Sequence, residues 1–380
     1  MSEEDVVHDA LERLEWDERK EDESPFKRWR QMTRRTALTG SAAAIGAMVI
    51  EACGGSSGSS TTNAKASGGG SSAAQGIFGV GGGYKFTFVN HVTTNTFFVP
   101  TQYGIADACK LFNCSYQWTG SQSSNVSEMV NAINSAVAAG VDGIATCLVD
   151  PTAFNAPVSK ALSAGIPVVA YNADAAGNPR LAYIGQDLYL SGQKMGEHIA
   201  SLVPSGDVAL FIATPGSLNI QPRIDGAIAT LKSHPSITPH TVATGAAIPA
   251  ELTVINSYAQ GHPGLKGMFA VDAGSTQGVA QTIQKQGLKG KVHGGGYDLL
   301  TPTIDLLAAG YIDFTIDQQP YLQGFVPTLQ LFMYKASQGL TGIADVDTGL
   351  KFLDPTTVKP YAKTKSRYEG SATAAGVANA

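Results

Sequence analysis

The sequence predicts an α/β fold in which two doubly wound units follow one another along the chain, each with a parallel sheet covered by helices. Two observations support this prediction. From residue 84 onward, short apolar runs alternate with helical patterns, and the same alternation starts again after residue 187. A helix between two strands returns the chain to the same edge of the sheet, so the strands run parallel. Residues 84–370 are enough for two domains of ordinary size.

The first unit is expected between residues 84 and 171. Its strands are predicted at Tyr84–Val92, Ser115–Trp118, Gly143–Val149 and Ile166–Tyr171. Its helices are predicted at Phe98–Leu111, Val126–Ala139 and Pro151–Ala164. The helix at Val126–Ala139 has the clearest spacing, because its apolar residues recur every three or four positions until Gly140 ends it.

The second unit is expected between residues 188 and 337. Its helices are predicted at Leu188–Leu202, Ile220–Leu231, Glu251–Gln260, Ser275–Gln286, Leu299–Ala308 and Tyr321–Ser337. Its strands are predicted at Asp207–Ala213, Gly267–Val271, Lys291–Tyr297 and Tyr311–Asp317. The sequence has no short-period repeat, which argues against a solenoid.

An export signal is predicted at residues 33–53. Arg34 and Arg35 precede an apolar run of about 14 residues, which is typical of a twin-arginine signal and shorter than the roughly 20 residues of a membrane span. The run ends in Ile50-Glu51-Ala52-Cys53, which resembles a bacterial lipobox whose cysteine receives lipid. The alternative is a plain secretory signal with an incidental cysteine. Both interpretations place the protein outside the cytoplasm.

The segments that flank the folded part are recognised by composition. Residues 1–53 carry the signal, residues 54–83 form a Gly/Ser-rich tether, and residues 371–380 form a disordered tail. Residues 1–52 hold 8 Lys and Arg and 12 Asp and Glu, which leaves 18 and 19 in the rest and a net charge near −1. This balance gives no basic stripe for nucleic acid. No later apolar run reaches spanning length, so we expect membrane attachment through lipid alone.

Four cysteines are present, and three of them follow the lipobox. Cys109 and Cys114 are close in sequence, and an oxidising compartment permits a disulfide between them. Two unpaired thiols are the alternative. Cys147 lies in an apolar strand and is expected to be a buried thiol. No cysteine or histidine spacing suggests a metal site, and we expect no cofactor.

A binding site is expected beyond the carboxyl ends of the strands, where open parallel sheets bind their ligands. Amides, carboxylates and aromatic rings recur at these ends: Asn90, His91, Asn95, Phe97, Phe98, Trp118, Asp150, Asn172, Asp174, Thr214, Asp272, Tyr297 and Asp298. Carboxylates and amides hydrogen-bond several hydroxyl groups, and aromatic faces cover the C–H faces of a sugar ring. The pattern therefore favours a hydroxyl-rich ligand.

Each of these residues also has an interpretation that involves no ligand. Asp150 precedes a proline and is suited to cap a helix, and Asp298 is suited to cap the helix that follows it. His91 is interpreted as a structural histidine. One ring of the Phe97 and Phe98 pair is expected in the core. Trp118 is assigned to the site, with packing at a hinge as the alternative.

The chain resembles the periplasmic sugar-binding proteins of the ribose-binding type, which serve ABC transporters. The resemblance covers about 84–340 and rests on motifs in a fixed order: Asn95-Thr96-Phe97-Phe98, Gly165-Ile166-Pro167-Val168-Val169, Pro222-Arg223-Ile224-Asp225-Gly226, Val271-Asp272-Ala273-Gly274, Gly295-Gly296-Tyr297-Asp298 and Thr315-Ile316-Asp317-Gln318-Gln319-Pro320. The family fold has two lobes, joined by three crossing segments, that close on the ligand. The resemblance implies one lobe from 84–186 and 318–344, and another from 187–317 and 345–370.

The resemblance also implies positions for the ligand-binding residues. Asn95 and the two phenylalanines fall in the wall of the first lobe, and Arg223, Asp272 and Asp298 fall in that of the second. Gln318 falls at a hinge crossing. With Trp118, Asp150 and Asn172 from the strand ends, these make ten residues that are expected to bind the ligand. The family pattern has an adjacent Asp and Arg where this chain has Asn172-Ala173. A sugar other than ribose, or a polyol, is therefore expected.

The function expected from these observations is capture of a monosaccharide or sugar alcohol and its delivery to an ABC permease. The protein is expected to act as a monomer and not as an enzyme. A sensory protein that presents its ligand-bound form to a membrane receptor is one alternative. A secreted hydrolase is another, but the few histidines lie in no evident triad.

Overall fold

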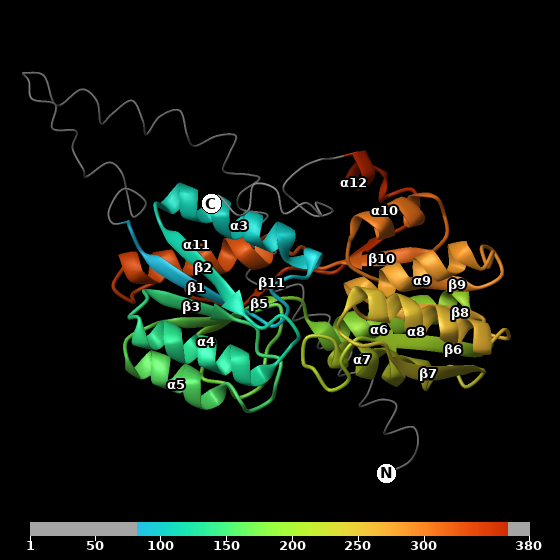
Figure 1. The fold of residues 1–380 in the computed structure, drawn as a ribbon, viewed down its shortest axis with the longest axis horizontal. Coiled ribbons are helices and arrows are strands. Elements are labelled where there is room, and N and C mark those ends of the chain that lie inside the picture. Colours follow the sequence, from blue (N-terminus) through green and yellow to red (C-terminus); the bar gives the residue numbers. More distant parts are fainter. Residues whose placement is uncertain (1–81, 364–380) are drawn as a thin grey trace, which may run out of the picture. The chain divides into compact units, whose positions relative to one another are not determined.

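The computed structural model describes residues 82–363, which form two α/β lobes (Figure 1). The predicted export signal with Cys53 and the tail at 371–380 lie outside the described residues, as does the tether up to residue 81. The predicted fold class is confirmed, because the two lobes each hold a sheet of parallel strands between helices.

Lobe 1 contains a six-stranded parallel sheet in the order β11-β5-β4-β3-β1-β2. Its strands are β1 (Lys85–Asn90), β2 (Ser115–Gly120), β3 (Gly143–Thr146), β4 (Val168–Tyr171), β5 (Ala182–Gly185) and β11 (Val346–Asp347). Its helices are α3 (Val99–Phe112), α4 (Val126–Ala138), α5 (Asn155–Ser163) and α11 (Leu322–Ala336), and η3 (Thr96–Phe98) is a 3₁₀ turn. Helices α3 and α11 cover one face of the sheet, and α4 and α5 cover the other (Figure 1).

Lobe 2 contains a second six-stranded sheet in the order β12-β10-β9-β8-β6-β7, in which only β12 is antiparallel to its neighbour. Its strands are β6 (Gly206–Ile212), β7 (Ile237–Ala243), β8 (Gly267–Ala270), β9 (His293–Tyr297), β10 (Phe314–Asp317) and β12 (Lys351–Leu353). Its helices are α6 (Leu188–Leu202), α7 (Gln221–Leu231), α8 (Ile248–Gly261), α9 (Ala273–Lys285), α10 (Thr301–Ala308) and α12 (Lys359–Lys363).

The core of lobe 2 shows why its strands read as continuous apolar runs. In β6, Val208 and Leu210 pack into one cluster, and Phe211 packs into a second cluster on the opposite face of the sheet. In β8, Met268 and Phe269 divide between the same two clusters. Helices cover both faces, so successive side chains must all be apolar.

The sequence analysis missed four strands, of which β7, β11 and β12 lie at sheet edges and β5 lies next to β11. β7 is an edge strand of alternating exposure that contains Pro239, so it has no continuous apolar run. β5 has only four residues, and β11 and β12 have two and three. Such short strands carry too little periodicity to be recognised from sequence.

The chain crosses between the lobes three times, and hydrogen bonds join the crossings. The Gln186 side chain on the first crossing donates to the Gly349 carbonyl on the third, at 3.0 Å. The Thr348 hydroxyl on the third donates to the Gln318 carbonyl on the second, at 2.8 Å. The expected boundary at 344/345 is a few residues too early, because Val346–Asp347 pairs with β5 of lobe 1.

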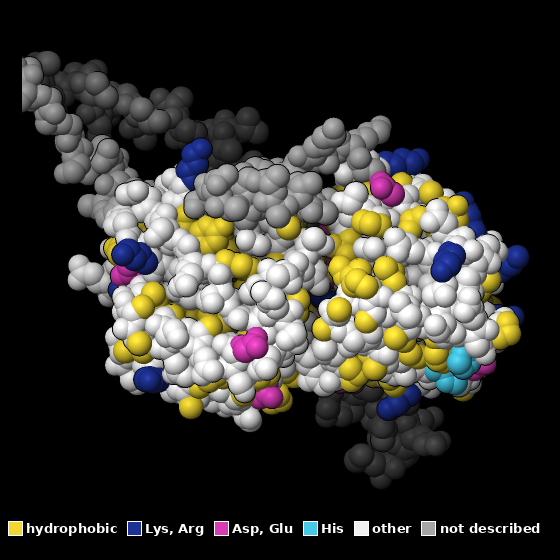
Figure 2. Space-filling view, viewed as in Figure 1, with side chains coloured by type: hydrophobic (Ala, Val, Ile, Leu, Met, Phe, Trp, Pro, Cys, Tyr) yellow, Lys and Arg dark blue, Asp and Glu magenta, His cyan; other side chains and the backbone are white. Residues whose placement is uncertain are grey.

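Within residues 82–363, none of the helices combines the length and the hydrophobicity needed to cross a membrane. On the face shown in Figure 2, charged side chains are sparse and scattered.

Candidate functional site

A cavity lies between the two lobes, at the carboxyl ends of their strands. Its volume is about 50 Å³, or about 340 Å³ when the open space at its mouth is included. It is lined by His91, Asn95, Phe97, Phe98 and Asn172 from lobe 1, by Asn219, Ile220, Arg223, Asp272, Ala273 and Asp298 from lobe 2, and by Gln318 from the second crossing. Eight of the ten residues that the sequence analysis assigned to the site therefore meet at one place.

Arg223 is positioned by close packing of its helix. It lies in the first turn of α7, and α6 approaches it so closely that a Cβ on Gly192 would be 2.2 Å from the Arg223 carbonyl oxygen. The guanidinium lies 4.0 Å from the centre of the Tyr297 ring and donates to the Val271 carbonyl at 2.8 Å and to the Gln186 side chain at 3.4 Å. The side chain is 2% exposed, and its Nε has no protein hydrogen-bond partner within residues 82–363.

Asp298 follows β9 in the left-handed region, with a φ of 75°. Its carboxylate accepts a hydrogen bond from the Gln318 side chain at 2.8 Å. Burial raises the pKa of Asp298 to about 6, although the nearby Arg223 guanidinium acts in the opposite direction. Asp298 does not cap the helix that follows it, because α10 begins at Thr301 and is preceded by Leu300. The capping interpretation of Asp298 is therefore wrong.

Asp272 combines a place at the cavity with a structural role. Its carboxylate caps α9 by accepting from the Ser275 backbone N–H at 2.8 Å, and it accepts from the Ala213 backbone N–H at 2.9 Å. Behind it, the buried Glu251 carboxyl occupies the space where a Cβ of Gly274 would lie, at 1.9 Å. Burial and the neighbouring Asp272 charge raise the pKa of Glu251 to about 9, so Glu251 is protonated at pH 7.

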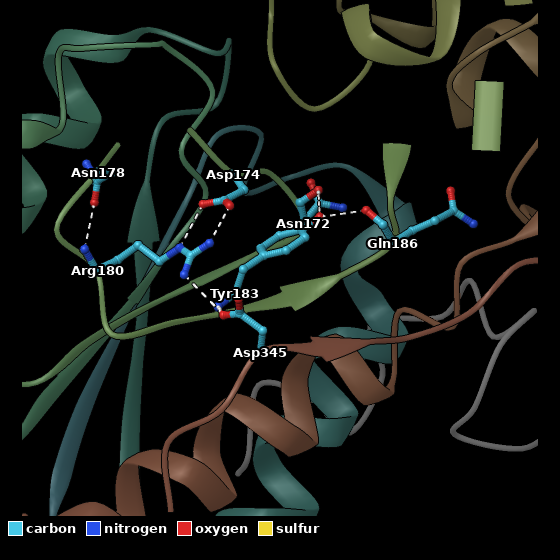
Figure 3. Close-up of polar contacts among 7 residues, drawn as sticks. All are labelled: Asn172, Asp174, Asn178, Arg180, Tyr183, Gln186 and Asp345. Atoms are coloured by element: carbon cyan, nitrogen blue, oxygen red, sulfur yellow. Dashed lines mark hydrogen bonds and ion pairs between the residues drawn. The ribbon is translucent and has the colours of Figure 1, made fainter. Parts of the chain in front are cut away.

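Asn172 lies where the family pattern has a charged pair. Its side-chain NH₂ donates to Gln323 at 3.2 Å and lies 3.5 Å from Gln318, while its Oδ1 has no protein partner within the described residues. The Tyr183 hydroxyl donates to the backbone oxygens of Asn172 and Gln186, which holds the start of the first crossing (Figure 3).

A charged pair does exist near Asn172, but it is outside the cavity. Arg180 donates to both carboxylate oxygens of Asp174 and also contacts Asp345 (Figure 3). Neither Arg180 nor Asp174 is among the residues that line the cavity. This pair joins the strand end of β4 to the segment that precedes β11.

The aromatic wall of lobe 1 consists of Phe97 and Phe98, which are both buried and pack edge to face at 4.7 Å. Asn95 supports this turn, because its side chain accepts from the Phe97 backbone N–H at 2.9 Å. Trp118 lies behind the wall: its ring is 5.9 Å from that of Phe98, and its Nε1 donates to the Thr93 carbonyl at 3.2 Å.

Two of the assigned residues do not line the cavity. Trp118 packs against the wall, which agrees with the packing alternative. Asp150 is half-buried and accepts from the backbone N–H groups of Thr152 and Ala153 at 2.9 and 2.8 Å. These hydrogen bonds lower the pKa of Asp150. Asp150 therefore stabilises a turn.

The sequence analysis missed Asn219, and it placed His91 at a strand end of the expected site but interpreted it as a structural histidine. Both line the cavity, and the Asn219 side-chain amide lies 3.1 Å from His91 Nε2 across the cleft. The position of His91 at the end of a strand was a usable signal. Asn219 comes from an irregular loop before α7, and its sequence carried no signal.

Cys109 and Cys114 are free thiols that lie side by side. Their hydrogen bond and the burial of Cys109 raise the pKa of the Cys109 thiol. A disulfide between them stays a prediction. Among residues 82–363, no group of three or more His, Cys, Asp or Glu side chains is placed to hold a metal ion.

Comparison with known proteins gives consistent matches. A family model described as a periplasmic binding protein domain matches residues 86–338. The xylose/arabinose-binding protein XylF of Sulfolobus acidocaldarius is 52% identical over 307 residues, which cover 77% of this chain and 76% of that protein. The D-ribose/D-allose-binding protein of Pseudomonas aeruginosa is 24% identical over 203 residues, covering 51% of this chain and 63% of that protein.

Solved structures agree. An ABC-transporter solute-binding protein from Burkholderia graminis C4D1M, in complex with D-arabinose, aligns with a TM-score of 0.69 and 26% identity. The alignment covers 74% of this chain and 99% of that one. The family and these relatives are binding proteins, so the chain is a binding protein and not an enzyme. With both lobes matched by sequence and by fold, this chain belongs to the periplasmic binding protein family, an extracytoplasmic family, and is of the ribose-binding type.

Proposed function

We propose that the protein is an extracytoplasmic lipoprotein that captures a monosaccharide between its lobes and delivers it to an ABC permease. The pentoses xylose and arabinose are the first candidates, and sugar alcohols are the second. The protein acts as a monomer and is held at the membrane by lipid on Cys53.

One observation in the cavity carries this proposal. Polar atoms from both lobes are buried around it without protein partners within the described residues, namely Arg223 Nε and Asn172 Oδ1. An unpaired buried donor or acceptor costs free energy, which a ligand recovers if it supplies the missing partner. A sugar hydroxyl both donates and accepts, so one kind of group serves both atoms. The faces of Phe97 and Phe98 suit the C–H groups of the ring.

The relatives support a pentose in particular. The relative that is 52% identical is named for xylose and arabinose, and the similar solved structure holds D-arabinose. The uncharged Asn172 supports a sugar other than ribose, since the ribose pattern has a charged pair there.

Binding at both lobes supports a mechanism of closure. A ligand that contacts both lobes stabilises their closed arrangement by the difference between its affinities for the closed and open states. The joined crossings at Gln186, Gln318 and Gly349 form the hinge about which the lobes move.

Binding is tested by thermal shift of the purified full-length chain against D-xylose, L- and D-arabinose, D-ribose and xylitol, followed by calorimetry. A true ligand raises the melting temperature by mass action, and the shift grows with ligand concentration. If none of these pentoses and polyols raises the melting temperature, the proposal is contradicted.

Anchoring is tested separately by cell fractionation. Cys53→Ser should move the protein from the membrane fraction to the soluble fraction, and replacement of Arg34 and Arg35 by Lys should block export. A wild-type protein that is already soluble contradicts the lipid anchor, and unchanged export points to a general secretory signal.

Transport is distinguished from sensing by labelled-pentose uptake in a gene deletion strain. Loss of uptake supports delivery to a permease. Unchanged uptake with loss of a pentose-induced transcriptional response supports the sensory alternative.

A further inference from the structure

The loop before α7 reaches across the cleft and contacts lobe 1 directly. The Leu218 backbone N–H donates to the Val149 carbonyl at 2.9 Å. The side-chain amide of Asn219 lies 3.1 Å from Nε2 of His91. These contacts join the lobes without passing through the three crossings.

The hydrogen bonds around Asn219 indicate which tautomer His91 adopts. The Ser217 hydroxyl donates to Asn219 Oδ1 at 2.6 Å, so the amide presents its NH₂ group to the imidazole. Nε2 of His91 must then accept. Burial lowers the pKa of His91 to about 4, so the ring is neutral at pH 7 and carries its single proton on Nδ1.

The remaining donor of His91 is not used by the protein. Nδ1 is buried and has no hydrogen-bond partner within residues 82–363. The ring packs edge to face on Phe98 at 5.3 Å, which restrains its orientation, and His91 lines the cavity with the charged groups of Arg223, Asp272 and Asp298. An unpaired buried N–H is costly, so the site calls for a ligand oxygen that accepts.

We propose that His91 couples sugar binding to lobe closure: its Nδ1–H donates to an oxygen of the bound sugar while its Nε2 accepts from Asn219 of the other lobe. This inference rests on the proposed function. Lobe closure then orients the imidazole ring through Nε2, and the bound sugar accepts a hydrogen bond from Nδ1 of the same ring. His91 also becomes a specificity residue, because the protein binds more tightly those sugars that have an acceptor oxygen at that position.

Two substitutions of His91 separate its two nitrogens. In His91→Gln, the side-chain oxygen can replace Nε2 as the acceptor for Asn219, but the Nδ1 donor is lost. In His91→Asn, the shorter amide can replace the Nδ1 donor, but it does not reach Asn219. Asn219→Ala removes the closure contact at a half-buried position of lobe 2, and we expect this variant to fold. His234→Asn, at an exposed histidine after α7, is the matched control.

Calorimetric measurement of the affinity for D-xylose and D-arabinose tests the contact between His91 and the sugar. We expect His91→Gln to weaken binding about tenfold, the effect of one lost hydrogen bond to a buried group. We expect His91→Asn and Asn219→Ala each to weaken binding about threefold to tenfold, and their combination to weaken it no further, because both remove the same contact. Wild-type affinity in His91→Gln, or additive effects of the latter pair, would overturn the inference.

A second measurement identifies the tautomer directly. Nitrogen-15 NMR of the imidazole in the pentose-saturated wild-type chain should show Nδ1 protonated and Nε2 unprotonated, and Asn219→Ala should relax this preference. If the wild-type chain binds neither pentose, the proposed function fails and the inference fails with it. A wild-type chain that binds a pentose but carries the Nε2–H tautomer overturns the inference alone.

Discussion

The guanidinium of Arg223 lies over the ring of Tyr297, 4.0 Å from its centre, although the two residues are far apart in the sequence. The Tyr297 hydroxyl is held in turn by Ser191 at 2.7 Å. Because the cation is placed by this ring and by the Val271 carbonyl, Arg223 is oriented before any ligand arrives. A binding site that is ordered in advance loses less conformational entropy when the ligand binds.

Gly192→Ala should weaken sugar binding through Arg223. The added Cβ would lie 2.2 Å from the Arg223 carbonyl oxygen, so α7 must move away from α6 and take the guanidinium with it. We expect affinity to fall about tenfold or more by calorimetry. Gly196→Ala, one turn along α6, meets Ala227 and Thr230 instead, and it should lower the melting temperature while leaving affinity near that of the wild type. Equal affinities for the two variants would exclude this positioning role.

Arg223→Ala and Asp298→Asn should each reduce affinity strongly. Truncating a charged group that hydrogen-bonds a buried ligand, as in Arg223→Ala, costs roughly 2–5 kcal/mol, or about 30- to 4000-fold in Kd. Asp298→Asn keeps an acceptor oxygen and should lie at the lower end of this range. Asparagine tolerates the φ of 75° at position 298, so Asp298→Asn tests the charge without straining the backbone. Circular dichroism should show a folded protein in both cases. A folded Asp298→Asn variant with unchanged affinity would remove Asp298 from the site.

The free energy of unfolding should decrease as pH rises from 6.5 to 8, because of Glu251. The pKa of Glu251 is raised from 4.5 to about 9 in the folded protein, so the folded state keeps a proton that the unfolded state releases. Its contribution is complete below pH 4.5 and is lost as pH rises towards 9, at up to about 1.4 kcal/mol per pH unit. Denaturant titrations should show this slope in the wild type and a flatter profile in Glu251→Gln. Identical slopes would mean that Glu251 is ionised in the folded state.

Sugar should change the fluorescence of Trp118. Trp118 is the only tryptophan in the sequence after the predicted signal segment. The centre of its ring lies 5.9 Å from the centre of the Phe98 ring, which forms part of the cavity wall. A sugar packed on this wall alters the environment of both rings, and lobe closure should also lower the radius of gyration. Phe98→Leu should reduce the fluorescence response. If scattering curves with and without saturating pentose superimpose, the closure mechanism is wrong.

Much of this molecule could be predicted from local sequence. Helix α4 was predicted to within a residue, since its apolar spacing is regular and Gly140 follows it. The residues at strand ends were identified because parallel strands present their carboxyl ends at one edge, whatever the details of packing. Asn95, Phe97, Phe98 and Asp298 reached the cavity for this reason.

Only the tertiary structure decided which of these residues line the cavity, which form hydrogen bonds elsewhere in the protein, and which partners they contact. Asp150 and Asp298 look alike in the sequence, yet only Asp298 lines the cavity, while Asp150 binds two backbone N–H groups of a turn. The contact of His91 with Asn219 joins residues 128 positions apart and depends on how two lobes meet. Local periodicity reports the burial of neighbouring residues, and it holds no information on distant loops. The sequence by itself therefore determined the two sheets and the edge at which a site forms, and only the packing of the lobes decided which polar atoms were left without a partner.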